Sequence, residues 1–100
     1  MSNPSVTVII PSVRNHEELD IVLKGLSNQT YNGPCKIVVV GPTNDPGKEV
    51  CKENNILFID DEGSRTRADA CNIAINATES ELILFTDDDV IVPKDWIEKL

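Results

Sequence analysis

Short apolar runs recur along the chain and are separated by polar stretches. Two of them, Lys36–Val40 and Leu82–Phe85, show no alternation of apolar and polar residues, which is typical of strands buried on both faces of a sheet. With two further runs, they predict strands at Ser5–Ile10, Lys36–Val40, Ile56–Ile59 and Leu82–Phe85. We expect Pro11 to stop the first strand, because proline cannot donate a hydrogen bond to a neighbouring strand.

A helical pattern follows each predicted strand. After the first strand, apolar residues recur at the i, i+3, i+4, i+7 spacing of one helix face, at Leu19, Val22, Leu23 and Leu26. Asn15 with Glu18 resembles a capping box at the start of this helix. Asp45 offers an N-cap for the next helix, with Pro46 at its first position. The expected helices cover Asn15–Ser27, Pro46–Asn54, Thr66–Ala77 and a stretch from Pro93 that carries Trp96, Ile97 and Leu100.

The alternation of strands and helices predicts the fold class. Each interval between strands leaves room for one crossover helix, so we expect an α/β fold with a mostly parallel sheet of about four strands between two helical layers. We interpret residues 1–100 as a single domain. Because the last periodic stretch reaches Leu100 without a stop signal, we expect a fragment of a longer protein, and its uncovered apolar face makes self-association plausible.

Composition narrows the class of protein. The chain has 100 residues, 40% of them hydrophobic, and a formal net charge of −8, which fits a soluble globular domain and argues against nucleic acid as a partner. No apolar run approaches the roughly 20 residues of a membrane span. The N-terminus lacks the basic start of a signal peptide, so a cytoplasmic location is expected, with the inner face of the membrane as an alternative. A zinc site is not expected, because no Cys-x-x-Cys occurs and His16 is the only histidine.

The candidate chemistry lies after the fourth predicted strand, in the acidic cluster Asp87, Asp88 and Asp89. Ligands of open α/β sheets bind at the carboxyl ends of the strands. Two like charges about 4 Å apart repel by roughly 4 kcal/mol at an effective dielectric near 20, so a partly buried cluster needs a cation or a proton. Carboxylate oxygens suit Mg²⁺ or Mn²⁺, which usually share their ligand shell with phosphate oxygens. The alternative is an acidic surface turn.

Four motifs resemble family-2 inverting glycosyltransferases of the GT-A fold. Val6-Thr7-Val8-Ile9-Ile10-Pro11-Ser12 looks like their opening strand, and Leu26-Ser27-Asn28-Gln29-Thr30-Tyr31 like their L-x-x-Q-T-Y/F motif. Ala70-Cys71-Asn72-Ile73-Ala74-Ile75 resembles their A-x-N-x-G/A-I helix. Leu84-Phe85-Thr86-Asp87-Asp88-Asp89 with Pro93-Lys94-Asp95-Trp96-Ile97 resembles their DxD strand and the segment behind it. The four occur in the family's order and cover nearly the whole chain.

The resemblance implies the donor-binding half of an enzyme that transfers a sugar, with inversion, from a nucleotide-diphosphate sugar to an acceptor. It implies that Pro11 and Ser12 lie against the nucleoside. Asp87 would approach the ribose or sugar and share the metal, Mn²⁺ or Mg²⁺, and Asp89 would ligate the metal that bridges the diphosphate. Asp88 could take either role.

The resemblance also implies a basic residue near the diphosphate, for which Arg65 and Arg67 are the candidates. The alternative for both is a solvated side chain, or one paired with the acidic residues Asp60, Asp61 and Glu62. Guanidinium groups and helix N-termini both suit phosphate oxygens.

One position departs from the family pattern. Relatives usually carry an acidic residue after the second strand that hydrogen-bonds the base, whereas this chain has Val40-Gly41-Pro42-Thr43. Thr43, Asn44 or backbone groups would then replace it, or the nucleobase would differ. The family's catalytic base and acceptor pocket lie beyond about residue 100, so no catalytic residue is expected here. The acceptor, whether glycan, lipid or small molecule, is not specified.

Two other functions remain open. The chain could be a non-catalytic α/β module that keeps the nucleotide cleft for binding or assembly. A sugar-phosphate nucleotidyltransferase is disfavoured, because such enzymes carry a glycine-rich phosphate loop after the first strand and Pro11-Ser12-Val13-Arg14-Asn15 has no glycine.

Overall fold

The computed structural model describes residues 4–13, 17–42, 44–63 and 66–99. The strands are β1 (Val6–Pro11), β2 (Cys35–Gly41), β3 (Leu57–Asp60) and β4 (Leu82–Phe85). The helices are α1 (Glu17–Leu26), α2 (Gly47–Glu53) and α3 (Arg67–Asn76). Within the described ranges, no helix is long and apolar enough to cross a membrane.

All four strands form one parallel sheet in the order β3-β2-β1-β4, which confirms the predicted α/β fold. The chain builds the sheet outward from β1 to β2 and β3, and then crosses back so that β4 pairs with the other side of β1. In the register, Val6 lies beside both Cys35 and Leu82. The direction of strand addition therefore reverses between β1 and β4, and such a switch point is where open α/β sheets bind ligands.

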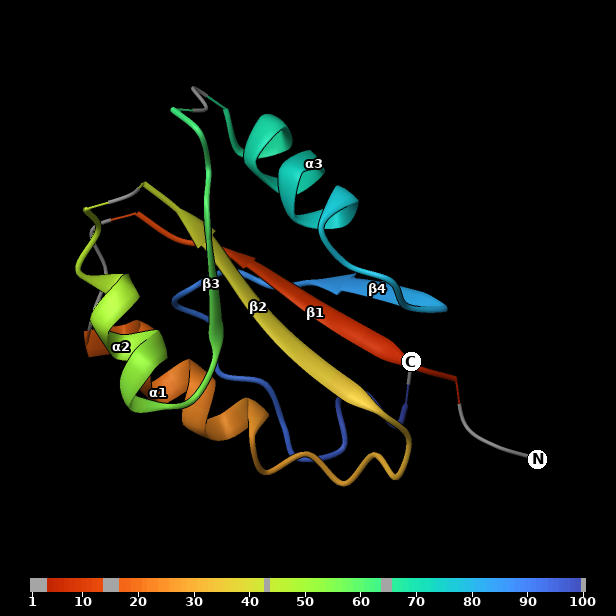
Figure 1. The fold of residues 1–100 in the computed structure, drawn as a ribbon. Coiled ribbons are helices and arrows are strands. Elements are labelled where there is room, and N and C mark those ends of the chain that lie inside the picture. Colours follow the sequence, from red (N-terminus) through yellow and green to blue (C-terminus); the bar gives the residue numbers. More distant parts are fainter. Residues whose placement is uncertain (1–3, 14–16, 43, 64–65, 100) are drawn as a thin grey trace.

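Helices cover both faces of the sheet, as Figure 1 shows. On one face, α1 and α2 pack on a buried cluster that includes Val8 and Ile10 of β1 and Val39 of β2. On the other face, α3 packs on a smaller cluster through Ala70 and Ala74, whose short side chains let the helix lie close to the strands. The result is the three-layer arrangement that the sequence predicts.

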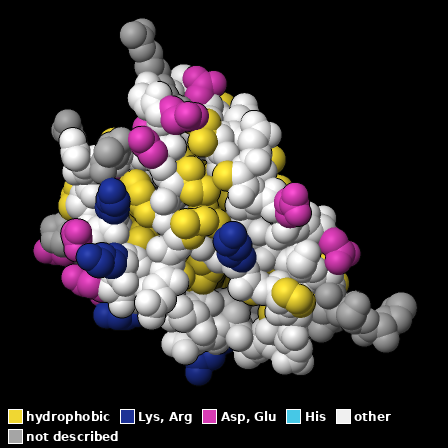
Figure 2. All heavy atoms as spheres, in the orientation of Figure 1, with side chains coloured by type: hydrophobic (Ala, Val, Ile, Leu, Met, Phe, Trp, Pro, Cys, Tyr) yellow, Lys and Arg dark blue, Asp and Glu magenta, His cyan; other side chains and the backbone are white. Residues whose placement is uncertain are grey.

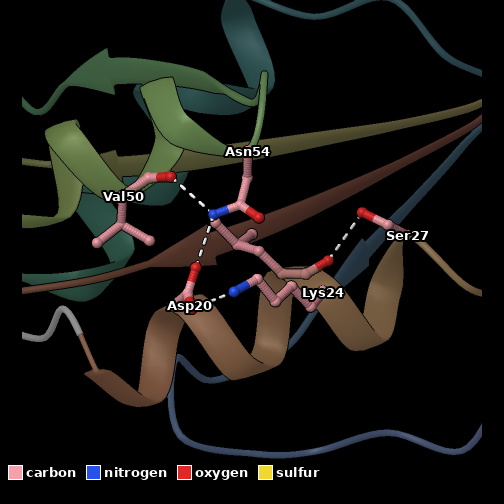
Figure 3. A network of polar contacts seen from close by, with 6 residues as sticks. Asp20, Lys24, Ser27, Val50 and Asn54 are labelled. Carbon is pink, nitrogen blue, oxygen red and sulfur yellow. Dashed lines mark hydrogen bonds and ion pairs between the residues drawn. The ribbon is translucent and has the colours of Figure 1, made fainter.

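A polar network joins the two helices of the first face (Figure 3). The side-chain amide of Asn54, at the end of α2, donates to Asp20 of α1 at 2.9 Å and to the carbonyl oxygen of Val50 at 2.8 Å. Lys24 donates to Asp20 at 2.7 Å. Hydrogen bonds from Lys24 and Asn54 hold the pKa of the Asp20 carboxyl below its ordinary value. The network fixes α2 against α1 on the solvent side of the layer.

The prediction of a helix starting at Pro93 is wrong. Residues 94–99 form successive turns rather than a regular helix. The backbone N–H of Ile97 is bonded to the side chain of Gln29 at 3.0 Å, so it is not available for a helical ladder. Ile97 is nevertheless buried and belongs to the same cluster as α1, with Trp96 packed against it. The sequence predicted the apolar contacts of Trp96 and Ile97 correctly and the backbone conformation wrongly, while Leu100 lies outside the described residues.

The strand Leu82–Phe85 is also less buried than expected. It forms as predicted, but Leu82 and Phe85 are each 49% exposed, because β4 has β1 on one side and no second neighbour in the four-stranded sheet of the described residues. Most other boundaries differ from the prediction by one or two residues, and the expected cap Asn15 lies outside the described residues. β1 includes Pro11, and α2 follows Pro46, which occupies the N-cap, while Asp45 still accepts the backbone N–H of Gly47 at 2.8 Å.

Candidate functional site

A cavity of about 350 Å³ opens at the switch point between β1 and β4. Pro11 at the end of β1 lines it on one side, and Cys71 of α3 lines it on another. The remaining lining residues follow or end β4, namely Phe85, Thr86, Asp87 and Val90. The parallel pairing explains the position, because the backbone N–H of Thr86 still bonds to the carbonyl oxygen of Ile9 at 3.2 Å. The segment that carries the acidic cluster therefore leaves the sheet beside the end of β1.

Ser12 ties this segment to β1. Its backbone N–H bonds to the carbonyl oxygen of Val40 at 2.9 Å, so the residue after β1 is held by β2. Its side chain is buried, and its hydroxyl donates to Oδ2 of Asp88 at 2.9 Å. The structure thus brings together Ser12 and Asp88, two of the predicted site residues, across 76 positions of sequence.

The three aspartates differ in exposure. Asp87 and Asp88 are half-buried, and Asp89 is exposed. Over the described part of the chain, no group of three or more His, Cys, Asp or Glu side chains is arranged to hold a metal ion. Mg²⁺-like ions commonly bind one or two carboxylates and complete their shell with phosphate oxygens and water. The oxygen donors present therefore fit a hard cation that arrives with a phosphate ligand, and not a cage made by the protein alone.

The start of α3 is where the basic residues were expected. Thr66 caps the helix by accepting the backbone N–H of Asp69 at 3.1 Å. Arg67 is the first residue of α3. Arg65 lies outside the described residues, as does the side chain of Arg67, so the phosphate-binding roles of both stay predictions.

The end of β2 has no room for a side chain at position 41. A Cβ atom on Gly41 would collide with the backbone carbonyl oxygen of Ser12 and press on the ring of Phe58. A side chain at this position would therefore displace the turn that carries Ser12. Thr43 lies outside the described residues, and Asn44 is exposed.

The next loop brings carboxylates to the same edge of the sheet. The backbone N–H of Asp61 bonds to the carbonyl oxygen of Gly41 at 2.9 Å, and the Asp61 side chain is buried. Asp60 accepts the N–H of Glu62 at 3.0 Å. Figure 2 shows acidic side chains gathered at the top of the view, beyond β3 and the start of α3. Carboxylates therefore follow both β3 and β4 at this edge of the sheet.

Several cavity and supporting residues were not predicted. Cys71 and Val90 line the cavity, although the sequence pattern indicated no site role for either. Cys71 follows Ala70, which packs α3 on the sheet. Its position next to a sheet-facing residue of the helix is the sequence signal that could have placed Cys71 near the cavity. Gln29 and Thr30 belong to the L-x-x-Q-T-Y/F motif, but the pattern indicated no contact for them.

Comparison with known proteins identifies the fold family. The family model "Glycosyl transferase family 2" matches residues 7–100. An N-acetylglucosaminyltransferase of Azorhizobium caulinodans is 32% identical over 105 residues, covering 97% of this chain and 26% of the relative. Glycosyltransferase GlyA of Streptococcus pneumoniae is 30% identical over 100 residues, covering 95% of this chain and 14% of the relative. The chain therefore spans about a quarter or less of these relatives.

Two solved structures share the architecture. Mannosyltransferase PcManGT from Pyrobaculum calidifontis, solved with GDP-Man and Mn²⁺, has a TM-score of 0.81 at 23% identity, over 93% of this chain and 30% of that chain. Glucosyl-3-phosphoglycerate synthase from Mycobacterium tuberculosis, solved with Mn²⁺, UDP and glucosyl-3-phosphoglycerate, has a TM-score of 0.73 at 14% identity, over 86% and 34% of the two chains. At these identities the likeness shows the fold, and it confirms the Rossmann-like GT-A prediction. With the family model covering nearly all of its length, the chain belongs to glycosyl transferase family 2.

Proposed function

We propose that this chain is the donor-binding part of a glycosyltransferase that transfers a sugar, with inversion, from a nucleotide-diphosphate sugar to an acceptor. The observation that carries the proposal is the acidic cluster at the switch point, where Ser12 holds Asp88 beside a cavity that Asp87 lines. The relatives named above are glycosyltransferases, which supports the same class of reaction.

The cavity fits a ligand that brings its own phosphate groups. Its walls are mostly apolar on the β4 side, through Phe85 and Val90, while Asp87 offers carboxylate oxygens at one edge. Small-molecule sites commonly combine an apolar lining with a few oriented polar groups, in volumes from about 300 Å³ upward. A nucleoside or sugar would lie against the apolar wall, and the diphosphate would point toward the acidic cluster.

A divalent cation is part of the proposal. Asp89 and Asp87 would hold Mn²⁺ or Mg²⁺, and the two solved structures named above, each with Mn²⁺ and a nucleotide ligand, support this choice. When bound, such an ion neutralises charge that develops on the departing diphosphate. Without it, a diphosphate would meet uncompensated carboxylates and be repelled.

Residues of β1 and its turn would hold the nucleoside. Pro11 lines the cavity directly. The hydroxyl of Ser12 is committed to Asp88, so Ser12 would meet the nucleoside through backbone atoms and would orient Asp88 through its side chain. Arg65 and Arg67, which precede and begin α3, would neutralise the second phosphate. Gly41 leaves base recognition to backbone groups or to Asn44 and Thr43.

The acceptor site and the catalytic base belong to a further part of the enzyme in this proposal. Here the chain's own residues bind and orient the donor. A glycan, a lipid or a small molecule remains open as the acceptor. In the alternative function, a non-catalytic binding module, the protein would have the same donor site but would not transfer the sugar.

Calorimetric titration tests the proposal. The chain is titrated with GDP-mannose and with UDP-glucose, with and without Mn²⁺, and we expect binding that depends on the metal. Asp89→Asn should weaken metal-dependent binding at least about tenfold, since even outer-shell changes at metal sites cost about 10–100-fold. Asp20→Asn is the matched control, because it removes one carboxylate on α1, where Asp20 bonds to Lys24 and Asn54. Equal binding with and without Mn²⁺ would contradict the proposal.

A further inference from the structure

Gln29 uses both ends of its side-chain amide to hold the segment that follows the acidic cluster. Its Nε2 donates to the carbonyl oxygen of Pro93 at 2.7 Å. Its Oε1 accepts the backbone N–H of Ile97 at 3.0 Å. One side chain thus spans a loop of five residues and bonds to both of its ends. An ionised carboxylate has no donor, and a hydroxyl would have to make both bonds from a single oxygen, whereas the amide offers a separate donor and acceptor.

Thr30 continues the same contact. Its backbone N–H bonds to the carbonyl oxygen of Lys94 at 2.8 Å, and its hydroxyl bonds to the same oxygen at 3.3 Å. The hydroxyl also contacts a carboxylate oxygen of Glu98. In Figure 1 the blue chain that leaves β4 runs past α1 and lies beside the orange loop that follows α1. We call the contacts of Gln29 and Thr30 with residues 93–98 the clamp.

The clamp gives the backbone N–H of Ile97 its acceptor. Ile97 is 4% exposed and belongs to the same buried cluster as Leu19 and Leu23. A buried N–H without an acceptor costs about 1–3 kcal/mol. Gln29 supplies that acceptor and also bonds to the exposed Pro93, so it fixes where Ile97 enters the core relative to Pro93.

The distance to the acidic cluster is short. Asp89 and Pro93 are four residues apart, so at most about 14 Å of extended chain separates their Cα atoms. On the other side, the cluster is fixed by the bond of Ser12 to Asp88 and by the pairing of Thr86 with Ile9. The exposed Asp89 therefore lies between two anchors, and Gln29 makes the second of them.

We propose that Gln29 is a positioning residue that sets where Asp89 stands relative to Asp87 and so tunes the affinity for the divalent cation. The inference rests on the proposed function, because it assigns a role toward the metal of that donor site. Gln29 touches neither metal nor donor. Its effect passes through Pro93 and the three residues that connect Pro93 to Asp89.

Three variants separate the clamp from general stability. Gln29→Met keeps the length and apolar stem of the side chain and removes both hydrogen bonds. Gln29→Glu keeps an acceptor for the N–H of Ile97 and places a second acceptor against the carbonyl oxygen of Pro93. Asn28→Ala is the matched control, because Asn28 is the exposed neighbour whose amide bonds to Lys24 within the end of α1.

The test titrates the chain with Mn²⁺ in the presence of GDP or UDP, and electron paramagnetic resonance measures the bound ion. The titrations run at a temperature where circular dichroism shows every variant folded. We expect Gln29→Met to weaken Mn²⁺ binding about 10–100-fold, the range of outer-shell substitutions at metal sites. Gln29→Glu should fall between Gln29→Met and the wild type, and Asn28→Ala should bind as the wild type does. If Gln29→Met does not fold, Gln29→Glu decides the outcome.

The outcomes distinguish the two proposals. Unchanged Mn²⁺ affinity in a folded Gln29 variant, with normal metal-dependent binding of GDP or UDP by the wild type, overturns the positioning role alone. A wild type that binds neither nucleotide in a metal-dependent way overturns the proposed function, and the positioning role with it. Amide hydrogen exchange at Ile97 is an independent measurement. The exchange should be faster in Gln29→Met than in the wild type and should stay slow in Asn28→Ala.

Discussion

The two central strands and the two edge strands have similar apolar sequences and opposite environments. In β1 and β2, the side chains of Val8, Ile9 and Val39 are completely buried. In β3 and β4, the first and last residues are exposed and the two between are half-buried, and Leu57 and Leu82 are 46% and 49% exposed. The difference in burial follows from the position of each strand in the sheet, because each central strand has two strand neighbours and a helix on each face.

The central strands supply stability, and the edge strand β4 carries the residues of the candidate site. The central pair forms the core, whereas β4 delivers the acidic cluster and lines the cavity. Figure 2 shows hydrophobic side chains in the middle of one face, over β3. Exposed apolar edges of this kind commonly mark surfaces that another part of a protein or another copy covers. The self-association expected from the sequence stays a prediction.

The largest expected effect comes from removing volume in a central strand. Ile9→Ala should lower the free energy of unfolding by about 2–5 kcal/mol, because Ile9 is completely buried and the cavity left behind cannot fill with water. Urea denaturation followed by circular dichroism measures the change.

Leu82→Ala is the matched change in an edge strand. Half of its side chain is already in water, so the loss should stay below about 1 kcal/mol. Equal losses for Ile9→Ala and Leu82→Ala would break the comparison, since they would mean that the edge strands carry as much of the core as the central ones.

The sequence predicts strand positions better than strand burial. The run Leu82–Phe85 was found to the residue, because a short apolar run between turn residues is a local signal. Its place at the edge depends on the order β3-β2-β1-β4, which is a long-range property that no local pattern carries. The turns at 94–99 were missed for a similar reason, because the bond from Ile97 to Gln29 joins residues 68 positions apart.

The second effect tests how tightly the carboxyl ends of the central strands pack. Gly41→Ala should destabilise the fold by about 1–3 kcal/mol, because the new Cβ would collide with the carbonyl oxygen of Ser12. It should also weaken metal-dependent nucleotide binding, since Ser12 holds Asp88. Denaturation and the Mn²⁺ titration measure the two effects separately.

Gly25→Ala provides the control for this substitution. Gly25 lies within α1, and a Cβ atom added there would meet nothing within 4 Å, so alanine should stabilise the helix by about 0.5–1 kcal/mol. If Gly41→Ala were as harmless as Gly25→Ala, the close approach of β2 to the turn after β1 would not limit the residue at position 41.

The candidate site was predicted in part. The pattern located the acidic cluster and the end of β1 at one edge of the sheet, and the structure brings Ser12 and Asp88 into contact there. It did not reveal that the Ser12 hydroxyl is used for this bond, nor that Cys71 lines the cavity. These facts depend on side-chain directions, which follow only once the strands are paired and α3 is packed. The individual roles of Asp87 and Asp89 toward a metal stay predictions.

The smallest effect concerns the layer that covers the central strands. Asn54→Ala removes the bond to Asp20 that joins α2 to α1 (Figure 3), and should lower the free energy of unfolding slightly near neutral pH, because a hydrogen bond to a carboxylate in contact with solvent is lost. Because Lys24 and Asn54 lower the pKa of Asp20, this stabilisation is present above the ordinary carboxyl range near pH 4 and is lost as the pH falls through the lowered pKa. The difference between Asn54→Ala and the wild type should therefore shrink in acid. Urea titrations at neutral pH and near pH 3 measure it, and a difference that grows in acid would mean that Asp20 does not hold α2 in place.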